Sequence, residues 1–163
     1  MQSPDAVRTL LAELKASGWM VAVAEADTGG LLLAWLTAEP GSSTAVLGGI
    51  VPYADALKRS FLGVPAELLA QHGAVSAAAA EAMARGILDA AGADLGLAST
   101  GIAGPGGATP TKPIGLAFIA AATRRGTRVR EHHWPGDRAA NRQASATAML
   151  HLALEVLRDA PGV

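Results

Sequence analysis

Residues 20–36 read MVAVAEADTGGLLLAWL, and this stretch sets the type of fold. The apolar run from Met20 to Ala24 is short and continuous, as is typical of a strand buried on both faces. The residues from Leu31 to Leu36 are predicted to form a helix, and Thr28 is suited to cap its first turn. A strand that leads directly into a helix indicates an α/β fold.

The same alternation of helices and strands continues on both sides of this unit. Helices are expected over residues 7–14, 54–61 and 65–71, from an N-cap at Ser76 to Gly92, and from Asp137 onward. Strands are expected over residues 44–51, 95–100, 114–122 and 127–133, with a hairpin turn at residues 124–126. This order predicts a three-layer α/β/α sandwich with a mixed, mainly parallel sheet.

Composition narrows the class of protein. A length of 163 residues, half of them hydrophobic and 17% charged, predicts one domain over residues 1–163 with a substantial core. There is no cysteine, which excludes disulfides and cysteine nucleophiles. The 13 basic and 14 acidic residues lack the basic excess expected of a nucleic-acid-binding surface, so no direct nucleic-acid partner is expected. Without a signal peptide or a membrane-spanning run, the chain is predicted to be cytoplasmic, with no membrane partner.

The first candidate site is the turn after the strand, residues 24–30. Free backbone amides at the start of a helix favour an anion or an oxyanion, and Gly29 and Gly30 allow a ligand to approach the backbone. An ordinary strand-to-helix turn is an equally good interpretation of these residues.

The second candidate site covers residues 48–58. Tyr53 is the only tyrosine of the chain, and Lys58 follows five residues later, so both could face one cleft. A lysine in apolar surroundings can act as a general base. Most lysines are solvated, so a solvated helix residue is the alternative interpretation of Lys58.

The third candidate site is the glycine-rich segment Ser99 to Gly107. Its spacing matches neither the dinucleotide-binding fingerprint nor a P-loop. Its amides could surround a phosphate or simply make tight turns. His132 and His133 are adjacent on a predicted strand and point to opposite faces, so no metal is expected.

Together, these clusters resemble the CinA C-terminal domain family from about Leu10 to Leu157. Further matches are Pro40-Gly41-Ser42-Ser43, the segment from Leu62 to Pro65, the segment from His72 to Ser76, Lys112-Pro113-Ile114-Gly115, and Gly136-Asp137-Arg138 with Arg142. The resemblance implies a homodimer that binds a small pyridine nucleotide. It also implies hydrolysis of nicotinamide mononucleotide to nicotinate mononucleotide and ammonia, without metal or cofactor.

The resemblance also implies roles for individual residues. In the family a serine attacks the amide carbon, a lysine takes its proton, and amides at the helix start stabilise the oxyanion. Lys58 matches the lysine, Tyr53 matches a neighbouring tyrosine, and Arg142 is placed to pair with the phosphate. The remaining substrate-binding positions implied are Thr28, Gly29, Gly30, Thr100, Gly101, Gly104 and Gly106.

The chain departs from the family at the nucleophile. The family usually reads Ala-Glu-Ser-Cys-Thr-Gly-Gly, and here Ala26 and Asp27 replace the serine and the cysteine. Three explanations remain open. Asp27 could activate a water, or Ser42 or Ser43 could supply the hydroxyl. Alternatively, the pocket remains but the reaction is lost, leaving a nucleotide-binding or protein-interaction module linked to competence or DNA damage.

Overall fold

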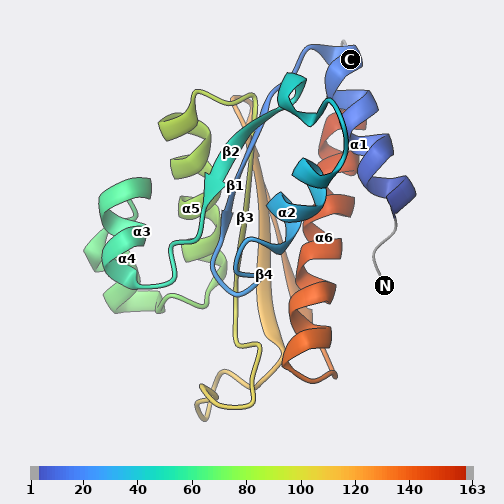
Figure 1. Cartoon of the computed structure of the whole chain (residues 1–163). Coiled ribbons are helices and arrows are strands. Elements are labelled where there is room, and N and C mark those ends of the chain that lie inside the picture. The colour runs from blue at the N-terminus through green and yellow to red at the C-terminus, as the bar shows by residue number, and fades with distance from the viewer. Residues whose placement is uncertain (1–3, 161–163) are drawn as a thin grey trace.

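The computed structural model describes residues 4–160 as one five-stranded sheet with helices on both faces (Figure 1). The strands are β1 (Val21–Glu25), β2 (Val46–Ile50), β3 (Leu95–Gly101), β4 (Leu116–Thr123) and β5 (Gly126–His133), in the order β2-β1-β3-β4-β5. β1 pairs in parallel with β2 and β3, and β4 pairs antiparallel with β3 and β5. The sheet is mixed, as predicted. Two of the four adjacent strand pairs are parallel and two are antiparallel, because β4 alone runs opposite to the other strands.

The helices form two layers that enclose the sheet (Figure 1). One layer contains α1 (Pro4–Ser17), α2 (Leu31–Ala38) and α6 (Arg138–Arg158), and the other contains α3 (Asp55–Leu62), α4 (Ala66–His72) and α5 (Ala77–Ala91). Each layer has its own core, because alternate strand side chains point to opposite faces of the sheet. This confirms the three-layer sandwich. No helix within residues 4–160 has the length and apolar character needed to cross a membrane.

Several predicted helix ends are confirmed. Ser76 Oγ accepts a hydrogen bond from the Ala79 N–H at 3.1 Å, and Gly92 ends α5 with a φ of 64°. At the start of α6, Asp137 Oδ1 accepts from the Ala140 N–H at 2.9 Å. α6 therefore begins where the sequence predicts.

The start of α2 differs from the prediction. Gly30, in the left-handed conformation with a φ of 89°, is the N-cap residue and makes no side-chain cap. The carboxylate of Glu25 instead accepts from the N–H groups of Leu32 at 2.9 Å and Leu33 at 2.7 Å. The Thr28 hydroxyl donates to this carboxylate at 2.6 Å, so the prediction of Thr28 as the cap is wrong. A charged acceptor is the stronger partner for helix-start amides.

Candidate functional site

A pocket of about 160 Å³ lies where β1 and β3 end. The carboxyl ends of parallel strands share one edge of a sheet, and open α/β folds place their ligands there. The pocket brings together parts of all three predicted clusters. It is lined by Ala26, Asp27, Tyr53, Asp55, Lys58, Ala74, Val75, Thr100, Gly101, Ala103 and Arg138.

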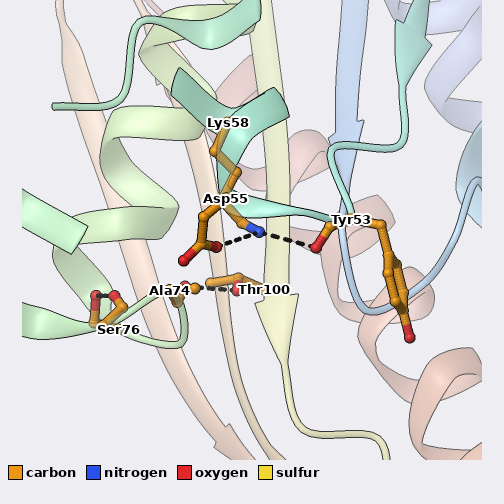
Figure 2. A network of polar contacts seen from close by, with 7 residues as sticks. Tyr53, Asp55, Lys58, Ala74, Ser76 and Thr100 are labelled. Atoms are coloured by element: carbon orange, nitrogen blue, oxygen red, sulfur yellow. Dashed lines mark hydrogen bonds and ion pairs between the residues drawn. The ribbon is translucent and has the colours of Figure 1, made fainter. Parts of the chain in front are cut away.

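Lys58 is buried in the wall of this pocket, with 3% of its surface exposed. Its Nζ donates to Asp55 Oδ1 at 3.2 Å and to the Tyr53 carbonyl at 3.4 Å (Figure 2). An ammonium group has three N–H donors, so within the described residues one of them is left for a ligand. The interpretation of Lys58 as an ordinary solvated lysine is therefore wrong.

Tyr53 contacts Lys58 through its backbone rather than its ring. The ring points away from Lys58 in Figure 2, and 66% of the residue is exposed. Its hydroxyl accepts a hydrogen bond from Arg138 Nη2 at 3.3 Å. The two residues thus share the pocket, but the Tyr53 hydroxyl belongs to its outer rim.

Asp27 is a buried carboxyl group in the wall of the pocket, with 9% of its surface exposed. Burial raises the pKa of Asp27 above its ordinary value of 3.8, although hydrogen bonds from Ser99, Ser145 and backbone amides lower it in part. Within the described residues, its Oδ1 atom is inaccessible and has no hydrogen-bond partner of good geometry. A Cβ at Gly101 would lie 2.9 Å from Asp27 Oδ2, so a glycine is needed beside this carboxyl.

The glycine turn of residues 28–30 follows Asp27 in the chain but does not line the pocket. The amides of Leu32 and Leu33 are already bound to Glu25, so the anion at this helix start is the chain's own carboxylate. Arg142 donates to the Thr28 carbonyl through Nε at 3.2 Å and Nη2 at 2.8 Å. Arg142 is also absent from the pocket lining, so in this structure it holds the turn in place.

The third predicted cluster, which runs from the end of β3 into the following loop, is only partly at the pocket. Thr100 and Gly101 line it, and Thr100 Oγ1 donates to the Ala74 carbonyl at 2.7 Å (Figure 2). The Gly104 carbonyl is held at the rim by Arg138 Nη1 at 2.8 Å. Gly106 is exposed and does not line the pocket.

Ser42 and Ser43 are not brought to the pocket in this chain. They lie in a 3₁₀ turn (Ser42–Thr44) that precedes β2. The next residue, Ala45, accepts a hydrogen bond from the Val21 N–H at 2.9 Å, which places the turn at the amino end of β1. Asp27 follows the carboxyl end of β1, so the serines and the pocket lie at opposite ends of the strands.

Two pocket residues were missed by the site prediction. Asp55 stands one helical turn before Lys58, and this spacing favours an ion pair. Arg138 belongs to the Gly136-Asp137-Arg138 motif, but only Arg142 was given a ligand-binding role. Within residues 4–160, no group of three or more His, Asp or Glu side chains could hold a metal ion.

Comparisons with known proteins agree with this architecture. The model of the CinA C-terminal domain matches residues 5–157. A CinA-like protein of Mycobacterium sp. (strain JLS) is 49% identical over 156 residues, covering 95% of this chain and 36% of that protein. A CinA-like protein of Synechococcus sp. (strain CC9311) is 54% identical over 110 residues, covering 68% of this chain and 26% of that protein. The chain thus spans about a third or less of the length of these curated relatives.

Solved structures match over almost their whole length. A competence/damage inducible protein from Agrobacterium tumefaciens superposes with a TM-score of 0.91 at 37% identity, covering 96% of this chain and 95% of that one. A competence-damaged protein (CinA) superfamily protein from Klebsiella pneumoniae gives 0.90 at 35% identity, covering 96% and 99%. The sequence match and the shared fold together establish that this chain belongs to the CinA C-terminal domain family.

Proposed function

We propose that this chain hydrolyses the carboxamide of nicotinamide mononucleotide, giving nicotinate mononucleotide and ammonia, with water as the nucleophile. The observation that carries the proposal is that the buried Asp27 carboxyl and the buried Lys58 ammonium line the same pocket, together with Ala26. A base and a hydrogen-bond donor that converge on one space are what amide hydrolysis requires.

The proposed reaction starts with a water between Asp27 and the amide carbon. Asp27 takes a proton from the water as the new carbon–oxygen bond forms. Lys58 directs its free N–H at the reacting group and gives a proton to the amide nitrogen as the carbon–nitrogen bond breaks. The proton held by Asp27 then returns to Lys58, so the products are the carboxylic acid and ammonia and both side chains are restored.

The surroundings of Asp27 support its role as the base. Burial raises the pKa of Asp27, and a carboxylate with a raised pKa is a stronger base once it is ionised. Lys58 is held by Asp55 and the Tyr53 carbonyl, so its remaining N–H has a fixed direction. Thr100 is less suited to attack, because its hydroxyl donates to the Ala74 carbonyl.

Ala26 favours a second candidate function, in which the pocket binds the nucleotide without turning it over. A methyl group lines the pocket where the family usually has its serine, and it cannot attack a carbonyl. Loss of an attacking group removes several orders of magnitude in rate while binding contacts remain.

The two candidates are separated by ammonia release from nicotinamide mononucleotide, with calorimetric binding measured in parallel. Turnover by the unaltered chain that is lost in Lys58→Ala, and kept in the surface control Arg85→Met, supports the hydrolase. Binding without turnover, with turnover restored by Ala26→Ser, supports the binding module. Neither binding nor turnover in any of these proteins rejects both candidates.

A further inference from the structure

Arg138 lies at the mouth of the pocket, where the start of α6 meets Tyr53 and the loop after β3. It is the first residue of α6, and it lines the pocket with residues from the ends of β1 and β3. Its Nη1 donates to the Gly104 carbonyl at 2.8 Å and its Nη2 to the Tyr53 hydroxyl at 3.3 Å. The longer of these bonds, to an exposed hydroxyl, is the easier one to exchange for a ligand.

Arg138 makes no ion pair with any carboxylate of the described residues, unlike several other arginines. Arg85, Arg128 and Arg130 each pair with a carboxylate, at 3.3, 2.6 and 2.5 Å. No such ion pair to Arg138 occurs within residues 4–160, and both of its hydrogen-bond partners are neutral oxygens. A guanidinium has five N–H donors arranged in a fork that suits phosphate, so most of its capacity is free.

The pocket has opposite chemistry at its two ends. Asp27 is buried and Arg138 is exposed, which places a carboxyl inside and a cation at the mouth. A volume of about 160 Å³ is below the ~300–1,000 Å³ that encloses a whole drug-sized ligand. The pocket therefore suits one ring, with the rest of a nucleotide outside.

We propose that Arg138 binds the phosphate of the substrate at the mouth of the pocket, which orients the carboxamide inward toward Asp27 and Lys58. The identity of the ligand rests on the proposed function. Arg142, which the sequence favours for this role, is instead a positioning residue that holds the Thr28 carbonyl. Arg138 then selects a nucleoside monophosphate over the corresponding nucleoside.

The test compares the dissociation constants of nicotinate mononucleotide and nicotinate riboside by calorimetry. These ligands share a ring and a sugar and are not hydrolysed at the amide, so the ratio of their affinities isolates the phosphate. We expect the unaltered chain to favour the mononucleotide by about tenfold or more, as for a charge-assisted hydrogen bond. This preference should decrease as the salt concentration rises.

Three variants complete the test. Arg138→Met should bring the ratio close to one, and Arg138→Lys should keep part of it because a charge remains without the fork. The matched control Arg85→Met removes an exposed arginine of α5 that does not line the pocket, and it should keep the full ratio. Circular dichroism and the melting temperature establish that each variant is folded.

The proposal is overturned if the unaltered chain shows no preference, or if Arg138→Met keeps it. It is also overturned if the ratio is lost in Arg142→Lys but not in Arg138→Met, since the phosphate would then lie at Arg142. Binding and turnover are measured separately. An Arg138-dependent preference without ammonia release rejects only the hydrolase, and turnover with an Arg138-independent ratio rejects only this inference.

Discussion

Glu25 and Asp27 are two buried carboxyl groups in one short segment, and their surroundings differ. The carboxylate of Glu25 accepts hydrogen bonds from the Thr28 hydroxyl and from the amides of Leu32 and Leu33. Asp27 lines the pocket, and within the described residues its inaccessible Oδ1 atom has no hydrogen-bond partner of good geometry. Burial raises the pKa of both groups, so the pKa alone does not separate them.

The difference lies in what each carboxyl group is engaged with. Both oxygens of Glu25 are engaged, by the amides of Leu32 and Leu33 and by the Thr28 hydroxyl, so its carboxylate is part of the start of α2. Asp27 instead lies in the wall of a pocket, and a buried carboxyl group with a raised pKa in a pocket is typical of functional sites. The comparison therefore assigns stability to Glu25 and supports the base that we propose at Asp27.

The largest expected effect is on turnover in Asp27→Asn. This change keeps the shape of the side chain but removes the base, and we expect kcat/KM to fall about 10²- to 10⁴-fold. In the unaltered chain kcat/KM should also fall as the pH drops through the raised pKa of Asp27, because only the ionised form accepts a proton. Steady-state ammonia assays across pH check both results. An active Asp27→Asn protein would show that Asp27 is not the base.

Glu25→Ala should have the opposite profile, with its main effect on stability. It leaves the Thr28 hydroxyl and the amides of Leu32 and Leu33 without their buried acceptor, at a cost of about 1 kcal/mol or more for each. We expect the free energy of unfolding to fall by roughly 3 kcal/mol, measured by urea denaturation. Asp27→Asn is the control, and similar losses in the two variants would remove the distinction between them.

Thr28→Val isolates one bond of the Glu25 network. The valine keeps the shape of the side chain but removes the hydroxyl that donates to Glu25 at 2.6 Å and contacts Ser99 Oγ at 3.1 Å. We expect a loss of about 1–2 kcal/mol in the free energy of unfolding, with binding of nicotinate mononucleotide unchanged. A selective loss of binding would place the Thr28 side chain in the site.

The smallest expected effect is on the pH dependence of stability. The folded pKa of Asp27 is raised, so its contribution to stability is full below the unfolded pKa and is lost as the pH rises through the folded pKa. Asp27→Asn should therefore reduce the loss of stability above pH 3.8, and should be the more stable protein at neutral pH. The pKa of Glu25 is also raised, so Asp27→Asn should keep part of the decrease in stability with rising pH. The free energy of unfolding of both proteins is measured by urea denaturation at a series of pH values. If it changes with pH equally in the unaltered chain and in Asp27→Asn, the raised pKa of Asp27 is contradicted.

Local signals were sufficient to predict most of the secondary structure. Ser76 and Asp137 cap helices through their own side chains, and Gly92 ends α5 through a conformation that glycine adopts easily. The antiparallel pairing of β3 with β4 was not specified, because register and direction depend on contacts between distant residues.

The candidate site was predicted in outline, but several partners were not. The choice between Arg138 and Arg142 depends on which of them lines the pocket, and this follows only from the folded structure. Ser43 is close to the site motifs in sequence but lies at the opposite end of the sheet, which only the pairing of β1 with β2 reveals. The role of Glu25 depends on its reach to α2, seven and eight residues along the chain.

The anchoring of α2 by Glu25 also bears on how this family can evolve. The bonds that start the helix involve residues 25, 28, 32 and 33, and residues 26 and 27 lie between them. A lineage can replace both of these residues and still keep every bond of the anchor. The positions to which we assign the chemistry are thereby separated from those that hold the start of α2, so they can change without loss of the scaffold.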